Sequence, residues 1–116
     1  MWVFTQDGFI SVVDNKQEPG KLTARARDEQ SLQLLAELAG SEIHRSKNCD
    51  YPYRTFVTRD QLNEFMTAQI DSLDYRNFKS RVWQSRGEKY HDACTDVWEA
   101  MLAVTDNAAR GTGLYA

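Results

Sequence analysis

The chain has 116 residues, a length typical of one domain, and its 41% hydrophobic and 27% charged residues are typical of a globular protein. The net charge of −3 argues against a general nucleic-acid coat protein, which needs a basic balance to gain from counterion release. No apolar run approaches the length of about 18 residues that a membrane span needs, and the first residues do not form a secretory signal. We therefore expect a cytoplasmic protein with one domain over residues 1–105 and a flexible tail over 106–116.

Residues 2–13 are rich in aromatic and β-branched side chains, which favours a β-strand. Asp7-Gly8 interrupts this stretch and predicts a turn or a bulge near its start. Apolar residues occupy both alternating sets of positions, so we expect the strand to be buried on both sides. A polar loop over residues 14–20 follows.

The next stretch, residues 21–27, alternates cleanly between apolar and polar side chains. Successive side chains of a strand point to opposite faces, so Arg25 and Arg27 should lie on the face opposite to Leu22. We expect this strand to pair with the first one as a hairpin with a long loop.

A helix and a second strand pair are predicted to follow the first strand pair. Asp28 is a good N-cap for a helix that runs to about Ala39, with Gly40 as its stop. A shorter, more polar strand pair is then predicted over residues 43–47 and 53–57.

The rest of the chain is predicted to be helical. Thr58 followed by Gln61 has the pattern of a capping box at the start of the next helix. A third helix should begin near Phe78, and a fourth should follow Gly87 and run to about Thr105. The sequence therefore predicts an α+β fold: an antiparallel sheet of about four strands in ββαββααα order, with the helices packed on one face.

The sequence contains no motif that indicates a catalytic site or a metal-binding site. The only four soft metal ligands are His44, Cys49, His91 and Cys94; no pair has the spacing of a zinc finger, and Cys94 lies in an apolar stripe. Cys49 lies in a polar turn, but the sequence supplies no family signature of a thiol nucleophile. A glycine-rich phosphate loop is also absent. We therefore predict no enzyme, no catalytic residues, no metal and no cofactor.

The most informative surface feature combines arginine and tyrosine side chains. If the two strand pairs share one sheet face, these side chains could bind another protein or a single-stranded nucleic acid, or the arginines could simply pair with acidic neighbours. The candidate partner-binding residues are Arg25, Arg27, Tyr51, Tyr53, Arg54, Tyr75, Asn77 and Lys79.

Several motifs spread over most of the chain support a resemblance. They are Met1–Phe4, Gly8–Phe9, Ser11–Val13, Arg25–Arg27, Asp50–Arg54, Asp74–Tyr75, Asn77–Lys79, Tyr90–His91 and Val97–Trp98. With these motifs the chain resembles a family of short bacterial proteins found chiefly in actinobacterial genomes and their phages. The resemblance implies a bacterial or phage cytoplasmic setting and brings no assigned activity with it.

Two functions from different classes follow as hypotheses. The first is a non-enzymatic protein-binding domain whose partner is another protein or a nucleoprotein complex. In a phage or mobile-element setting, this includes an inhibitor of a host defence complex of the anti-CRISPR kind. The alternative is a small nucleic-acid-binding module that uses the same arginine- and tyrosine-rich sheet face. We expect no membrane partner in either case.

Overall fold

The computed structural model describes residues 1–47 and 49–105. The chain folds into two compact units. The first unit, Met1–Asp74, holds a β-sheet and two helices, and the second, from Tyr75 onward, holds two helices. The tail predicted over residues 106–116 lies outside the described residues. One domain over residues 1–105 stays a prediction.

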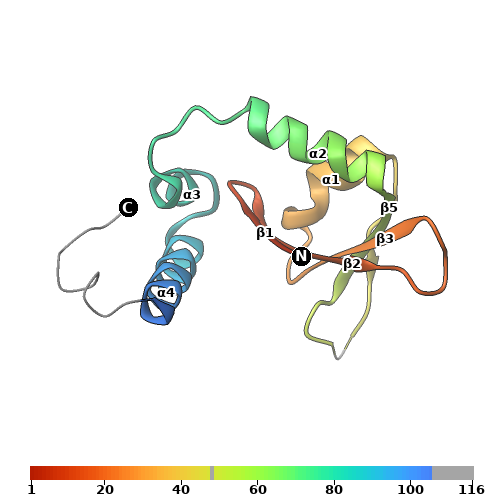
Figure 1. Ribbon diagram of the computed structural model, residues 1–116, viewed down its shortest axis with the longest axis horizontal. Coiled ribbons are helices and arrows are strands. Elements are labelled where there is room, and N and C mark those ends of the chain that lie inside the picture. The colour runs from red at the N-terminus through yellow and green to blue at the C-terminus, as the bar shows by residue number, and fades with distance from the viewer. Residues whose placement is uncertain (48, 106–116) are drawn as a thin grey trace. The chain divides into compact units, whose positions relative to one another are not determined.

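The sheet of the first unit is antiparallel and has five strands in the order β1-β2-β3-β5-β4 (Figure 1). The strands are β1 (Trp2–Thr5), β2 (Gly8–Asp14), β3 (Lys21–Ala26), β4 (His44–Arg45) and β5 (Tyr53–Thr58). The predicted α+β class is confirmed, with one strand more than the approximate four. The additional strand arises because the turn predicted at Asp7-Gly8 splits residues 2–13 into a hairpin, in which Gly8 lies opposite Thr5.

Helix α1 (Gln30–Ala39) follows β3 after residues 27–29, and its N-cap position is Glu29, one residue after the predicted Asp28. The carboxylate of Asp28 accepts a hydrogen bond from the backbone N–H of Ser31 at 2.8 Å and so satisfies a free donor of the first turn. Gly40 ends the helix with a left-handed φ of 61°, a conformation that glycine adopts without steric cost.

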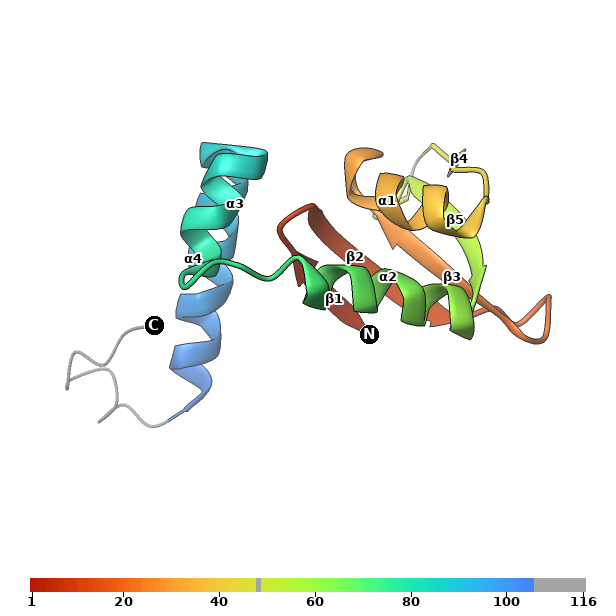
Figure 2. The ribbon, with the colours of Figure 1, turned by 90° about the horizontal axis from the view of Figure 1, so that it is seen from above.

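Helix α2 (Arg59–Asp71) begins with the predicted capping box. The Thr58 hydroxyl accepts a hydrogen bond from the backbone N–H of Gln61 at 3.1 Å, and the Gln61 side chain accepts one from the backbone N–H of Thr58 at 2.8 Å. The box fixes the point at which β5 turns into the helix. Figure 2 shows α1 and α2 beside the sheet within this unit.

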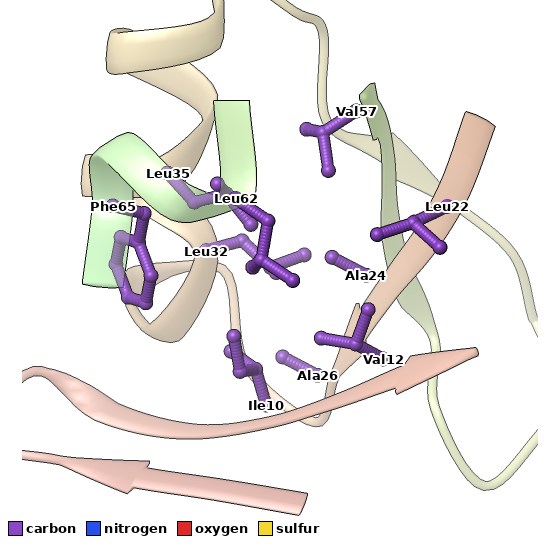
Figure 3. Close-up of a cluster of buried hydrophobic side chains, with 10 residues drawn as sticks. All are labelled: Ile10, Val12, Leu22, Ala24, Ala26, Leu32, Leu35, Val57, Leu62 and Phe65. Carbon is purple, nitrogen blue, oxygen red and sulfur yellow. The ribbon is translucent and has the colours of Figure 1, made fainter. Parts of the chain in front are cut away.

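The core of the first unit lies between these two helices and one face of the sheet. Its buried residues are Ile10, Val12, Leu22, Ala24, Ala26, Leu32, Leu35, Val57, Leu62 and Phe65 (Figure 3). The predicted packing of helices on one face is therefore confirmed for α1 and α2. The intervening strand residues point to the opposite face, and no helix described within this unit covers that face. We call it the open face.

The second unit is a helical hairpin. Helices α3 (Phe78–Arg86) and α4 (Glu88–Val104) meet at Gly87, close to the predicted bounds. Val82 and Cys94 are its buried apolar residues in the described part of the chain. Across the described ranges 1–47 and 49–105, no helix is both long enough and apolar enough to cross a membrane.

Candidate functional site

The open face carries a row of side chains that crosses all five strands. In the strand register, Trp2 lies opposite Ser11, Ser11 opposite Arg25, Arg25 opposite Arg54, and Arg54 opposite His44. Residues directly opposite each other in antiparallel strands point to the same face of the sheet. The row therefore has a tryptophan at the β1 edge, two arginines in its middle and a histidine at the β4 edge.

Aromatic rings form one end of the open face. Phe4 and Phe9 are directly opposite in β1 and β2, and their rings stack with centroids 4.5 Å apart. The Trp2 ring meets Phe9 edge-on at 5.6 Å. Phe4 and Phe9 are half-buried, whereas 70% of Trp2 is exposed. Trp2 thus offers a large apolar surface that two packed rings support from below.

Three arginines gather around Tyr51 in the middle of the open face. The guanidinium carbon of Arg25 lies 4.6 Å from the centroid of the Tyr51 ring, and that of Arg27 lies 5.0 Å from it. Both distances are within the range of a cation–π interaction, which is worth about 0.5–2 kcal/mol depending on desolvation. Arg54, opposite Arg25 in the register, directs its Nε–H to the Tyr51 carbonyl oxygen at 3.5 Å. We call Arg25, Arg27 and Arg54 the arginine cluster.

Tyr51 can occupy this position because the loop before β5 is fastened at several points. The backbone N–H of Ser46 donates to the Pro52 carbonyl at 2.7 Å, and the Cys49 thiol lies 3.3 Å from the Tyr51 carbonyl oxygen. Arg27 Nε donates to the Asp50 carbonyl at 3.2 Å. Only 4% of Tyr51 is exposed, so its ring is a packing element of the open face.

Tyr53 does not join Arg54 on the open face. It lies opposite Ala26 in the register, on the face that bears the core, and it packs partly against that core. Its ring instead contacts Arg45, whose guanidinium carbon is 5.5 Å from the centroid. Adjacent strand residues point to opposite faces, so Tyr53 and Arg54 cannot both contribute to one sheet surface.

The remaining predicted site residues belong to the second unit, where each has a local contact. Asn77 caps α3, because its Oδ1 accepts a hydrogen bond from the Ser80 backbone N–H at 3.0 Å. The Lys79 ammonium lies 4.6 Å from the Trp98 ring centroid. Tyr75 packs on Phe78, with centroids 6.1 Å apart. A shared surface between these residues and the arginine cluster stays a prediction.

Several residues of the open face were not predicted from the sequence. Ser11 is buried, and its hydroxyl accepts a hydrogen bond from Arg25 Nη2 at 2.8 Å. Phe4 and Phe9 support the exposed Trp2. The alternation along the strand could have identified them, because Phe9 and Ser11 alternate with the core residue Ile10 and so point to the opposite face of the sheet.

The thiols and histidines are divided between the two units, with His44 and Cys49 in the first and His91 and Cys94 in the second. Within residues 1–47 and 49–105, no three side chains of His, Cys, Asp or Glu type lie close enough to hold a metal ion. Cys94 is buried in the helical hairpin, and burial raises the pKa of its thiol because the thiolate would lose hydration there. His91 contacts the Trp83 ring at 4.9 Å and the Asp92 carboxylate at 3.0 Å. The prediction that the chain is no enzyme stays a prediction.

The chain is a small α+β protein, and within its first unit the described helices pack on one face of the sheet. Compared with protein-family models, with curated proteins and with solved structures, the chain matches none. The family resemblance that the motifs suggest therefore stays an expectation.

Proposed function

We propose that the chain is a protein-binding domain and that its partner docks on the open face of the sheet. One observation carries the proposal: an exposed tryptophan and a cluster of arginines share a sheet face that no helix described within the first unit covers. Tryptophan, tyrosine and arginine are the residues most enriched among those that dominate the energy of protein interfaces. Trp2 would be the apolar anchor, and the arginine cluster would supply directed hydrogen bonds.

The geometry of the aromatic rings favours a protein over a single-stranded nucleic acid. Proteins that bind single strands present free ring faces on which successive bases stack. Here the Tyr51 ring is buried beside two guanidinium groups, and Phe4 and Phe9 stack on each other. Trp2 offers the one largely exposed ring among these four.

The proposal extends to a specific biological role, the inhibition of a host defence complex. The resemblance to phage-borne proteins supports a role in inhibiting a host defence complex, in which a small domain would act by covering a surface of its target. Such a role needs no catalytic group, and the open face alone would be sufficient for it.

Capture of a partner from an extract of the native host tests the proposal, with matched arginine variants of the full chain. Arg54→Ala removes a cation from the open face, whereas Arg59→Ala removes an exposed one from the first turn of α2. We expect the same partner to be retained by the wild type and by Arg59→Ala and to be lost by Arg54→Ala, with all three folded by circular dichroism. Equal capture by the two variants would contradict the proposal. So would capture of nucleic acid without any protein, because the bound species would then not be a protein partner.

A further inference from the structure

The arginine cluster lacks the negative charge that three neighbouring cations would normally attract. Arg25, Arg27 and Arg54 make contacts with a ring, a hydroxyl and two backbone carbonyls, and within residues 1–47 and 49–105 none of them is paired with a carboxylate. Arg25 and Arg54 are moreover directly opposite in adjacent strands, where like charges destabilise a sheet. The open face therefore carries three arginines without an ion-pair partner among the described residues, on a chain whose net charge is −3.

The hydrogen-bonding capacity of the cluster is largely unused. Arg25 Nε is buried and has no hydrogen-bond partner among the described residues, which is rare for a native polar atom and calls for an explanation. Arg27 and Arg54 use only Nε, so both terminal nitrogens of each donate to no protein atom in the described part of the chain. These planar groups match the two oxygens of a carboxylate.

The cluster is also held in place before any partner arrives. The Tyr51 ring supports two of the guanidinium groups, the buried Ser11 hydroxyl fixes Arg25, and the Asp50 carbonyl fixes Arg27. Arginine side chains lose considerable rotamer entropy when a ligand orders them, and this prior ordering removes part of that cost. A local arrangement that is unfavourable in the free protein but ordered in advance is typical of a binding site.

We infer that the arginine cluster is an oxyanion-binding site that takes the carboxylates of an acidic segment of the partner protein. The inference rests on the proposed function and names the chemistry of the partner: glutamate or aspartate side chains opposite the cluster, beside an apolar group that contacts Trp2. A protein segment fits better than a phosphodiester chain, because the ring at the centre of the cluster is buried and offers no face to a base.

Fluorescein-labelled hexaglutamate is a direct probe of this site, with fluorescence anisotropy at an ionic strength of about 0.1 M as the readout. We expect the full wild-type chain to bind it, and Arg27→Gln and Arg54→Gln each to weaken binding about tenfold, as the loss of a charge-assisted hydrogen-bonded contact does. Arg59→Gln on α2 should change the affinity less than about twofold, because exposed charges away from the site are screened. Arg25→Gln is not used alone, because Arg25 also holds the buried Ser11 hydroxyl and its loss could unfold the sheet.

Specificity is tested with an oligothymidylate of equal charge under the same conditions. The peptide should bind more tightly than the oligonucleotide. Absence of peptide binding, equal weakening by Arg59→Gln and Arg54→Gln, or tighter binding of the oligonucleotide would each overturn the inference. If partner capture still depends on Arg54 while hexaglutamate fails to bind, the proposed function stands and only the carboxylate site is wrong.

Discussion

Tyr51 connects the packing of the open face to its proposed function. Its ring contacts Phe9 at a centroid distance of 6.3 Å and supports Arg25 and Arg27. The ring is thus the common neighbour of the aromatic residues and the arginine cluster. Loss of this one side chain would remove apolar packing and the support of two cations together.

Truncation of this ring should therefore be costly, whereas removal of its hydroxyl should not. We expect Tyr51→Ala to lower the free energy of unfolding by about 3 kcal/mol, which is typical of a buried aromatic side chain. Tyr51→Phe should change it by less than about 0.5 kcal/mol, because the ring remains and no hydrogen bond of the hydroxyl is seen among the described residues. Urea denaturation of both variants measures the difference, and an equal effect of the two substitutions would contradict the described packing.

The two cysteines should differ in reactivity. Cys49 is exposed and Cys94 is buried, with its pKa raised by loss of hydration. Because the thiolate is the reacting species, iodoacetamide near pH 8 should modify Cys49 well before Cys94. Mass spectrometry of the native chain measures the order, and faster labelling of Cys94 would contradict its position in the helical hairpin.

The raised pKa of Cys94 also has a consequence for stability. The folded state favours the neutral thiol over the thiolate. The contribution of Cys94 to the free energy of unfolding is therefore fully present below the pKa of the thiol in the unfolded chain, about 8.5. It is lost as the pH rises through the higher folded pKa. We expect Cys94→Ala to remove this decline of stability above about pH 9, and thermal denaturation over that pH range measures it. A Cys94→Ala variant with an unchanged alkaline decline would show that another group causes it.

At the scale of elements, local rules predict the boundaries well. The capping box of Thr58 and Gln61 and the stop at Gly40 are short-range features, and the structure has both where the sequence predicts them. The number of strands was harder to predict, because Asp7-Gly8 suits either a bulge or a hairpin. The burial of Tyr51 could not be predicted, since it depends on how a whole loop folds back on the sheet.

The capping box should have a measurable share of the stability of α2. We expect Thr58→Ala to lower the free energy of unfolding by about 1 kcal/mol, because the Gln61 N–H loses its acceptor. Thr67→Ala, at an exposed position inside the same helix, is the matched control and should be neutral or slightly stabilising, since alanine favours helices. Equal urea midpoints for the two variants would show that the cap contributes nothing.

At the scale of the whole molecule, the two units differ in how they can be stabilised. The first has its own core between helices and sheet, whereas the described buried apolar residues of the second are Val82 and Cys94. Because of this division, the candidate partner-binding residues belong to two different units. Arg25 and Arg54 meet because strand register brings them together, but no local rule relates them to Lys79, which is in the other unit.

A fragment of residues 1–74 should fold without the helical hairpin. We expect it to unfold cooperatively in urea with far-UV circular dichroism as the signal, because all residues of the core cluster lie within it. The fragment from residue 75 onward should be largely unfolded in isolation, since two short helices with little buried surface are marginal. A non-cooperative transition of the first fragment would contradict its independence.

The most direct test of the account measures the affinity of the captured partner for two variants that each remove one exposed apolar side chain. Trp2 is 70% exposed on the open face, and Ile70 is 65% exposed on α2, so neither substitution by alanine should unfold the chain. Isothermal titration calorimetry should give at least about tenfold weaker binding for Trp2→Ala, as for an interface anchor, and a change below about twofold for Ile70→Ala. Unchanged binding by Trp2→Ala, or a larger loss with Ile70→Ala, would show that the partner does not dock on the open face.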